Sequence, residues 1–285
     1  MSDIDRKIVF IGGDERNRHI YNSVKSIYKN TQIVAIDENE YNSKTVKNAD
    51  IIILPTISSK DGQTLFTPLY KSKIYIDDIA EDLKHCKAII GGKIDKKIGS
   101  IAKDEEIVIY EYINDESFKA LNAIPTAEGA IAIAVSNTEK TLWGAKCLVA
   151  GYGNIGKYLC YILTSFGADV TATARKKKDF DEMARKSVKS VNTSEVNEII
   201  SDFDIIFNTV PYRILNDDAL KGLNEEVLVI DLASFPYGLD HSKTEQFKCK
   251  TILATSLPGK YSPKTAANIA LSAILKILSE VLKNE

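Results

Sequence analysis

The sequence is poor in the residues that build metal and redox sites. Its 285 residues include three histidines and four cysteines, and neither type is clustered. No H-E-x-x-H pattern or paired-cysteine spacing is present, so the sequence predicts no metal site. The cysteines are typical of buried thiols in a reducing cytosol; they are Cys86, Cys147, Cys160 and Cys249.

An excess of charge of one sign is also missing. The 37 Lys and Arg residues nearly balance the 39 Asp and Glu residues, for a formal net charge of −2. This balance argues against a nucleic-acid partner, and no basic helix points to a membrane surface. We find no apolar run that approaches the span of a bilayer, and the charged N-terminus is not a signal peptide. We therefore expect a cytoplasmic protein that binds neither nucleic acid nor membranes.

The clearest motif that is present is G-Y-G-N-I-G at residues 151–156. A short apolar run precedes it, and apolar residues at spacings of three and four follow it. A second β-rich run over 169–173 completes the order strand, glycine turn, helix, strand. In that context the pattern G-x-G-x-x-G predicts a dinucleotide site, with the phosphates at the start of the helix.

The three glycines of this motif have different expected roles. Gly151 makes the tight turn, Gly153 leaves room for the pyrophosphate, and Gly156 lets the helix pack closely on the strand. The alternative is a glycine turn that only packs. The residues between the glycines are expected to belong to the same site; they are Tyr152, Asn154 and Ile155.

The end of the second strand predicts the choice of cofactor. An NAD site usually has Asp or Glu there for the ribose 2′-hydroxyl, whereas this chain has Ala174, Arg175 and Lys176. A guanidinium can bind a 2′-phosphate through two charge-assisted hydrogen bonds, and a carboxylate would repel it. The sequence therefore predicts NADP(H), held first by Arg175 and second by Lys176. The alternative is a solvated basic start of a helix, which we prefer for Lys177 and Lys178.

Alternating strands and helices predict an α/β protein with two doubly wound parallel-sheet domains. The first covers residues 1–122, and a C-terminal helix over 264–285 packs back onto it. The second covers residues 123–263 and is the Rossmann dinucleotide-binding domain. It begins with a linker helix over 126–140, because Pro125 stops the preceding segment. We expect the active cleft to lie between the two domains.

Substrate groups are expected beyond the carboxyl ends of the strands, where ligands of such sheets bind. In the first domain this edge holds Asp14, Arg16 and Asn17, for each of which a turn or a helix cap is the alternative. Arg16 is the first choice to bind a substrate carboxylate, because two N–H groups of its planar guanidinium can bond both carboxylate oxygens in one plane. The competing interpretation is that Arg16 forms a surface ion pair within the protein. The other candidates are Thr126 and Glu128 at the start of the linker helix and Lys260 in the last loop.

Two further kinds of residue have expected roles. The carboxylates Asp14 and Glu128 cannot bind a carboxylate while ionised, so we expect them to handle a proton or to orient a cation. Residues that follow the later strands are expected to contact the nicotinamide and ribose. These are Asn208, Thr209, Val210, Pro211, Asp231, Ala233, Ser234 and Pro258.

Taken in order along the chain, these motifs resemble the family of the dipicolinate synthase A subunit. The resemblance is carried by I-G-G-D at 11–14, I-P-T-A-E-G-A at 124–130, the glycine fingerprint with A-R-K at 174–176, N-T-V-P at 208–211, D-L-A-S at 231–234 and L-P-G-K-Y-S-P-K-T-A at 257–266. The fingerprint and the strand ends are common to many NADP dehydrogenases. The stretches P-T-A-E-G and P-G-x-x-x-P-K-T-A are more particular to this family.

The resemblance implies the last step of dipicolinic acid synthesis, in the mother-cell cytoplasm of a spore-forming bacterium. The substrate would be a cyclic dicarboxylate, the hydroxy-tetrahydro- or dihydro-dipicolinate that dihydrodipicolinate synthase makes, and NADP+ would oxidise it to dipicolinate. The implied partner is a flavoprotein-like B subunit, and we expect a homo-oligomer. The family supplies no acid or base to carry over.

Two alternatives stay open. One is another two-domain NADP-dependent dehydrogenase, of the 2-hydroxyacid or methylene-tetrahydrofolate type. The 2-hydroxyacid type needs a His–carboxylate pair late in the cofactor domain. The only late histidine is His241, which lies in a polar loop segment, so the sequence favours this alternative less. The other alternative is a non-catalytic regulatory protein, which would bind NADPH and turn nothing over.

Overall fold

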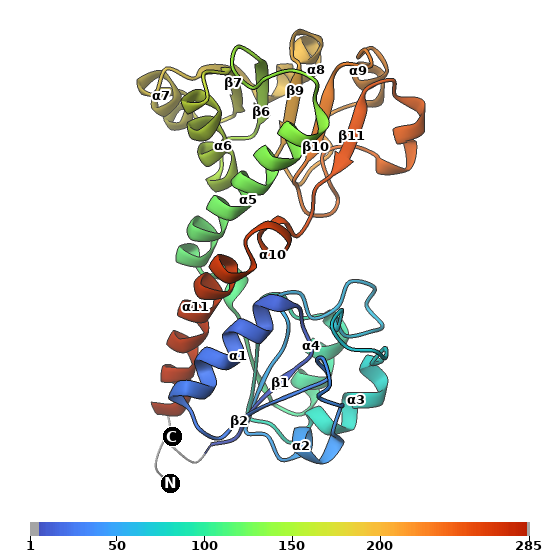
Figure 1. Cartoon of the computed structure of the whole chain (residues 1–285), viewed down its shortest axis with the longest axis vertical. Coiled ribbons are helices and arrows are strands. Elements are labelled where there is room, and N and C mark those ends of the chain that lie inside the picture. Colours follow the sequence, from blue (N-terminus) through green and yellow to red (C-terminus); the bar gives the residue numbers. More distant parts are fainter. Residues whose placement is uncertain (1–5, 284–285) are drawn as a thin grey trace. The chain divides into compact units, whose positions relative to one another are not determined.

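The computed structural model describes residues 6–283. The chain divides into two compact units, which can be followed by colour in Figure 1. Unit 1 consists of the chain up to Asn122 together with the segment from Ser262 onward, and unit 2 spans Ala123–Tyr261. Each unit is built on one parallel sheet, of five strands in unit 1 and six in unit 2, which confirms the predicted α/β class. The cleft expected between the domains stays a prediction.

The sheet of unit 1 has the strand order β2-β1-β3-β4-β5. Its strands are β1 (Ile8–Ile11), β2 (Thr31–Val34), β3 (Ile51–Ile53), β4 (Ala88–Gly91) and β5 (Val108–Glu111). The connections contain α1 (Glu15–Ile27), α2 (Ser43–Lys47), α3 (Ile76–Leu83) and α4 (Lys96–Asp104), and η1 (Tyr112–Asn114) follows β5. The chain leaves β1 toward one edge of the sheet and returns to build the other, which is the doubly wound arrangement.

Alternation along the buried strands gives this sheet two apolar faces. Ile8 and Phe10 of β1 belong to the cluster covered by α1 and α11 (Pro263–Lys283). Val9 and Ile11 belong to the cluster covered by α3 and α4. Helices therefore cover both faces, as a parallel sheet requires.

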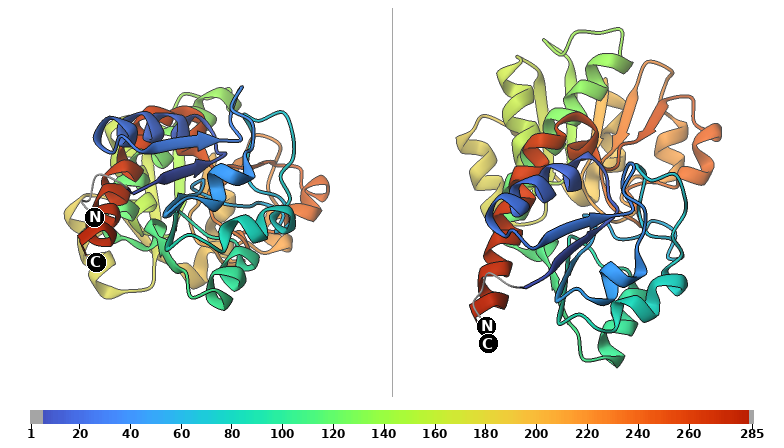
Figure 2. Two further views of the ribbon diagram at one scale, coloured as in Figure 1. Left: turned by 90° about the horizontal axis from the view of Figure 1, so that it is seen from below. Right: turned by 60° about the horizontal axis from the view of Figure 1, so that its bottom comes forward.

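The C-terminal helix α11 runs beside α1, as both views of Figure 2 show. It buries Ala267, Ala270, Ile274 and Leu278, which recur at helical spacing and pack in the same cluster as α1. The expectation that no apolar run approaches the span of a bilayer was wrong, because α11 has 21 residues and a mean hydropathy of 1.5. One stripe of this helix is buried on α1 and the sheet, which is the pattern of a helix that packs on a core.

The sheet of unit 2 has the strand order β11-β10-β9-β6-β7-β8. Its strands are β6 (Lys146–Ala150), β7 (Asp169–Ala174), β8 (Lys189–Asn192), β9 (Ile205–Asn208), β10 (Leu228–Asp231) and β11 (Lys250–Leu253). Its helices are α6 (Asn154–Ser165), α7 (Lys177–Arg185), α8 (Val196–Ile199) and α9 (Asp217–Lys221), with short turns η2 (Thr193–Glu195), η3 (Ile200–Asp202) and η4 (His241–Gln246). The sheet is again wound in both directions from its first strand.

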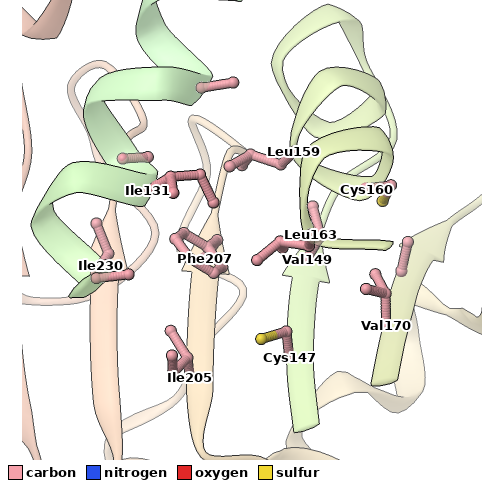
Figure 3. Packing of buried hydrophobic residues seen from close by; sticks show 14 of the residues in the cluster. Ile131, Cys147, Val149, Leu159, Cys160, Leu163, Val170, Ile205, Phe207 and Ile230 are labelled. Atoms are coloured by element: carbon pink, nitrogen blue, oxygen red, sulfur yellow. The ribbon is translucent and has the colours of Figure 1, made fainter. Parts of the chain in front are cut away.

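Helices α5 (Glu116–Asn137) and α6 cover one face of this second sheet. In Figure 3, Ile131 of α5 and Leu159 and Leu163 of α6 lie over Phe207 and Val149 of the central strands. The opposite face has its own cluster under α8 and α9, which includes Leu148, Ile206 and Val229.

Two local predictions were wrong. Pro125 does not stop the segment before the linker helix, because α5 runs unbroken from Glu116 to Asn137 with the proline inside it. The proline removes one backbone hydrogen bond, and the buried packing of residues such as Ala127 and Ala130 against the sheet holds the helix together.

The second wrong prediction concerns the segment after β11, which was expected to be a loop. It forms the short helix α10 (Leu257–Tyr261), in which Leu257 and Pro258 are buried. A proline in the first turn of a helix costs no hydrogen bond. A Cβ placed on Gly129 of α5 would lie 3.0 Å from the Cβ of Leu257, so the glycine permits this close contact.

Candidate functional site

A cavity of about 720 Å³ opens at the carboxyl edge of the second sheet. The turns that follow β6, β7, β8 and β9 line it. Residues predicted to bind the cofactor supply much of the lining; they are Gly151, Tyr152, Gly153, Asn154, Ala174, Arg175, Lys176, Thr209, Val210 and Pro211. The fold therefore gathers segments that are distant in the chain around one space of the size that ligands occupy.

The glycines of the fingerprint differ in their surroundings. Gly151 has a φ of +100°, and a Cβ on it would lie 2.5 Å from Thr209 Oγ1. A Cβ on Gly156 would lie 2.1 Å from the carbonyl oxygen of Gly151. A Cβ on Gly153 would meet nothing within 4 Å, so the space beside it at the start of α6 is open. This is the arrangement in which backbone N–H groups can receive a phosphate.

The basic residues after β7 belong to the lining of this cavity. Arg175 and Lys176 are exposed and line it. Lys178 lines it too, although the sequence favoured a solvated role for that residue. The turn after β8 was not predicted to take part, yet it contributes Asn192, Thr193 and Ser194. Its signal was a polar run directly after a short strand, the same feature that identified other strand ends.

Several predicted cofactor residues lie outside the lining. Ile155 and Gly156 belong to α6, and the others end or follow β9, β10 or β11; these are Asn208, Asp231, Ala233, Ser234 and Pro258. Asn208 and Asp231 are fully buried. Asn208 Nδ2 donates to Val210 O at 3.1 Å, and Val210 N donates to Asn208 Oδ1 at 3.2 Å. Asn208 therefore supports a turn that lines the cavity, and it does not itself face the cavity.

Asp231, at the end of β10, accepts four hydrogen bonds. Oδ1 receives Asn208 Nδ2 at 2.8 Å and Ala233 N at 3.1 Å. Oδ2 receives Gly238 N at 2.9 Å and pairs with His241 Nε2 at 2.9 Å. The sequence placed His241 in a polar loop segment and predicted no partner for it, and the structure pairs it with a buried carboxylate. The pair was not visible in the sequence because ten residues of chain separate its members.

In unit 1, Asp14 and Arg16 form an ion pair. Arg16 Nε lies 3.0 Å from Asp14 Oδ1, and Arg16 Nη2 lies 2.7 Å from Asp14 Oδ2. Asp14 also caps α1 by accepting a hydrogen bond from the Arg16 backbone N–H at 3.0 Å. Both alternatives raised for these residues, a cap and an ion pair, are therefore present. Within residues 6–283, Nη1 of Arg16 makes no hydrogen bond, so one donor group of the guanidinium stays available.

Other polar groups lie at the same edge of unit 1. Asn17 is buried against Gly13, and its Oδ1 has no hydrogen-bond partner in the described part of the chain. Tyr112 donates from its hydroxyl to Thr56 Oγ1 at 3.1 Å, and burial raises the pKa of Tyr112. No role was predicted for Tyr112 from the sequence.

The remaining candidates lie in helices. Thr126 is buried within α5, two residues before the exposed Glu128, and neither stands at a helix start. Lys260 is exposed in α10.

The four cysteines are free and buried, as predicted. Burial raises the pKa of Cys147 and of Cys160 to about 12, so these thiols are poor nucleophiles. Residues 6–283 contain no group of three or more His, Cys, Asp or Glu side chains that could hold a metal ion.

Comparison with known families assigns each unit separately. Residues 7–113 match the family described as the N-terminal domain of the dipicolinate synthase A subunit. Residues 127–234 match the family described as D-isomer specific 2-hydroxyacid dehydrogenase, NAD binding domain. The dipicolinate synthase A subunit of Bacillus subtilis (strain 168) is 28% identical to this chain over 292 residues, which cover 98% of each protein.

Solved structures agree with these matches. The dipicolinate synthase A chain from Bacillus subtilis has a TM-score of 0.86 at 28% identity and covers 98% of each chain. The same protein from Bacillus halodurans has a TM-score of 0.88 at 24% identity, over 98% of this chain and 99% of its own. D-lactate dehydrogenase from Escherichia coli, at 15% identity and a TM-score of 0.64 over 98% of each chain, shares the fold alone. The first unit therefore matches the dipicolinate synthase A family, and the chain is similar to the A subunit of that enzyme over nearly its whole length.

Proposed function

We propose that the chain uses NADP+ to oxidise a cyclic precursor to dipicolinate. Its relatives include the A subunit of a dipicolinate synthase, and its second unit matches a dehydrogenase domain. The observation that carries the choice of NADP is the end of β7, where Arg175 and Lys176 line the cavity. NAD sites usually place Asp or Glu there.

The surroundings of Arg175 support a phosphate at this end of the cavity. The hydroxyls of Thr193 and Ser194 and the ammonium group of Lys178 belong to residues of the same lining. They could add hydrogen bonds to a 2′-phosphate that the guanidinium binds. Asp179 also lines the cavity, but it lies in the first turn of α7, beyond the position of the ribose-binding carboxylate.

The proposed substrate is the product of dihydrodipicolinate synthase, a dihydro- or hydroxy-tetrahydro-dipicolinate. Such a ring carries two carboxylates, which need cations or hydrogen-bond donors. Arg16 is supported as one anchor because its Nη1 stays available beside the ion pair with Asp14. Asn17, Thr126 and Lys260 are further candidate anchors. Glu128, an exposed carboxylate in α5, stays a candidate for the proton or the hydroxyl.

The chemistry of this reaction divides between cofactor and protein. NADP+ supplies the hydride acceptor, and the glycine turn with its open space at Gly153 fits a pyrophosphate. The protein must fix the ring against the cofactor and accept a proton. We place the reaction in the mother-cell cytoplasm of a sporulating bacterium, with the chain as a homo-oligomer and a flavoprotein-like B subunit as its partner.

An absorbance assay tests this proposal. The product of dihydrodipicolinate synthase and NADP+ are added to the chain with and without a B subunit, and NADPH and dipicolinate are followed together. We expect the two to form in equal amounts. Binding of NADPH without turnover in either mixture would identify a regulatory protein, and equal rates with NAD+ would contradict the choice of cofactor.

A further inference from the structure

The strongest feature that the cofactor site leaves unexplained is the fully buried carboxylate of Asp231. It receives hydrogen bonds from two backbone N–H groups and the Asn208 amide, and it pairs with His241 Nε2 at 2.9 Å. An ionised carboxylate only accepts hydrogen bonds. In the neutral tautomer that donates from Nε2 to this carboxylate, the imidazole has its free lone pair on Nδ1.

The other edge of the His241 ring is available to a ligand. Nδ1 makes no hydrogen bond to any residue from 6 to 283. Tyr237 packs edge-on against the ring, with centroids 5.4 Å apart, which together with Asp231 fixes the orientation of the imidazole. The side chain is 19% exposed, so a small molecule can reach it from solvent.

The strand order of the sheet relates His241, through its partner Asp231 at the end of β10, to the expected path of a dinucleotide. Arg175 follows β7, the glycine turn follows β6, and the strands continue to β9 and then β10. A dinucleotide whose 2′-phosphate lies at Arg175 and whose pyrophosphate lies at the glycine turn continues in that direction. Its nicotinamide would then lie beyond the ends of β9 and β10. Asp231 pairs in register with Asn208 at the ends of these two strands, so the side chain that holds His241 belongs to the edge where the nicotinamide is expected.

Other carboxylates are less suited to accept a proton. Both oxygens of Asp14 are engaged by Arg16. Glu128 is exposed in a helix, and no hydrogen bond within residues 6–283 orients its carboxylate. Among the candidates in the described part of the chain, His241 combines an oriented ring, a nitrogen without a hydrogen bond and a partner at the end of β10, the edge where the nicotinamide is expected.

We propose that His241, oriented by Asp231, accepts the proton in the oxidation of the ring. This inference rests on the function proposed above. In the dihydro form of the substrate, one ring C–H bond breaks with transfer of hydride to NADP+. A second ring C–H bond breaks with transfer of its proton to Nδ1, and the two electrons left behind complete the aromatic pyridine ring. The imidazolium shares its Nε2 proton with Asp231 and releases the Nδ1 proton to water. Asp231 acts as a positioning residue.

His241→Gln is the variant that separates proton transfer from structure. The glutamine amide can still donate to Asp231 but offers no basic nitrogen. We expect kcat to fall by about 100-fold to 10,000-fold, the range typical of general acid–base catalysis. The Kd for NADPH, measured by calorimetry, and the melting temperature should stay at their wild-type values. His85→Gln, at an exposed position in unit 1, is the matched control and should leave all three unchanged.

The outcomes distinguish this inference from the function on which it rests. A wild-type chain that forms no dipicolinate with NADP+ and a B subunit would refute the proposed function and the role of His241 together. Wild-type turnover in His241→Gln would refute the role of His241 and leave the function standing. If His241→Gln melts early, His241→Ala assayed with added imidazole replaces it. Recovery of kcat with imidazole supports proton transfer, and wild-type kcat without imidazole refutes it.

Discussion

The sharpest test of the dinucleotide site is Gly153→Val. Gly153 precedes α6 with a φ of −83°, a value that valine adopts readily, and a Cβ there meets no protein atom within 4 Å. Gly153 lines the cavity, so the new side chain would take up space beside it where the pyrophosphate is expected. We therefore expect a folded protein that has lost the room for the pyrophosphate.

The two effects differ in size. Valine is a poorer helix cap than glycine, so the free energy of unfolding should fall by no more than about 1 kcal/mol. The added methyl groups would push the pyrophosphate away from the N–H groups that start α6. We expect the Kd for NADPH to rise at least about 100-fold, equivalent to about 2.8 kcal/mol of binding free energy.

Calorimetry with NADPH and a thermal melt measure the two effects. Gly99→Val is the matched control, because a Cβ on Gly99 also meets nothing within 4 Å and this residue lies in α4 of unit 1. The control should bind NADPH like the wild type. If Gly153→Val also binds NADPH with wild-type affinity, the phosphates lie elsewhere and the assignment of the cavity is wrong.

Three further substitutions test the cofactor choice, the substrate anchor and the glycine turn. Arg175→Asp should weaken the binding of NADPH by roughly 2–4 kcal/mol and that of NADH far less, because it replaces a group that binds the phosphate with a repelling charge. Equal losses of binding free energy for the two cofactors in calorimetry would contradict the choice of NADP. Arg16→Ala should lower kcat/KM by roughly two to three decades with NADPH affinity unchanged. Since it also leaves Asp14 without its ion-pair partner, a lower melting temperature with normal turnover would show a structural role alone. Gly156→Ala should destabilise the fold by about 1–3 kcal/mol, because its Cβ would lie 2.1 Å from the Gly151 carbonyl oxygen; an unchanged melting temperature would show that α6 can shift without cost.

The sequence was a reliable guide wherever a short stretch fixes its own structure. The buried strands, the glycine turn and the polar strand ends are local patterns, and the predicted parallel sheets are present. It failed where packing overrides local preference. Pro125 lies inside α5, and Leu257 to Tyr261 form a helix, because in both segments buried contacts outweigh the local signal for a break or a loop.

By itself the sequence determined the fold class, the glycine fingerprint and the resemblance to the dipicolinate synthase A subunit, because each depends on residues close together in the chain. Only the tertiary structure decided which side chains meet. It buried Asn208 and Asp231 outside the lining of the cavity, joined them by a hydrogen bond and paired Asp231 with His241. It also showed that Arg16 directs two of its donor groups to Asp14. Hydrogen bonds between loops depend on which loops the tertiary fold brings together, and the spacing of residues in the sequence does not determine this.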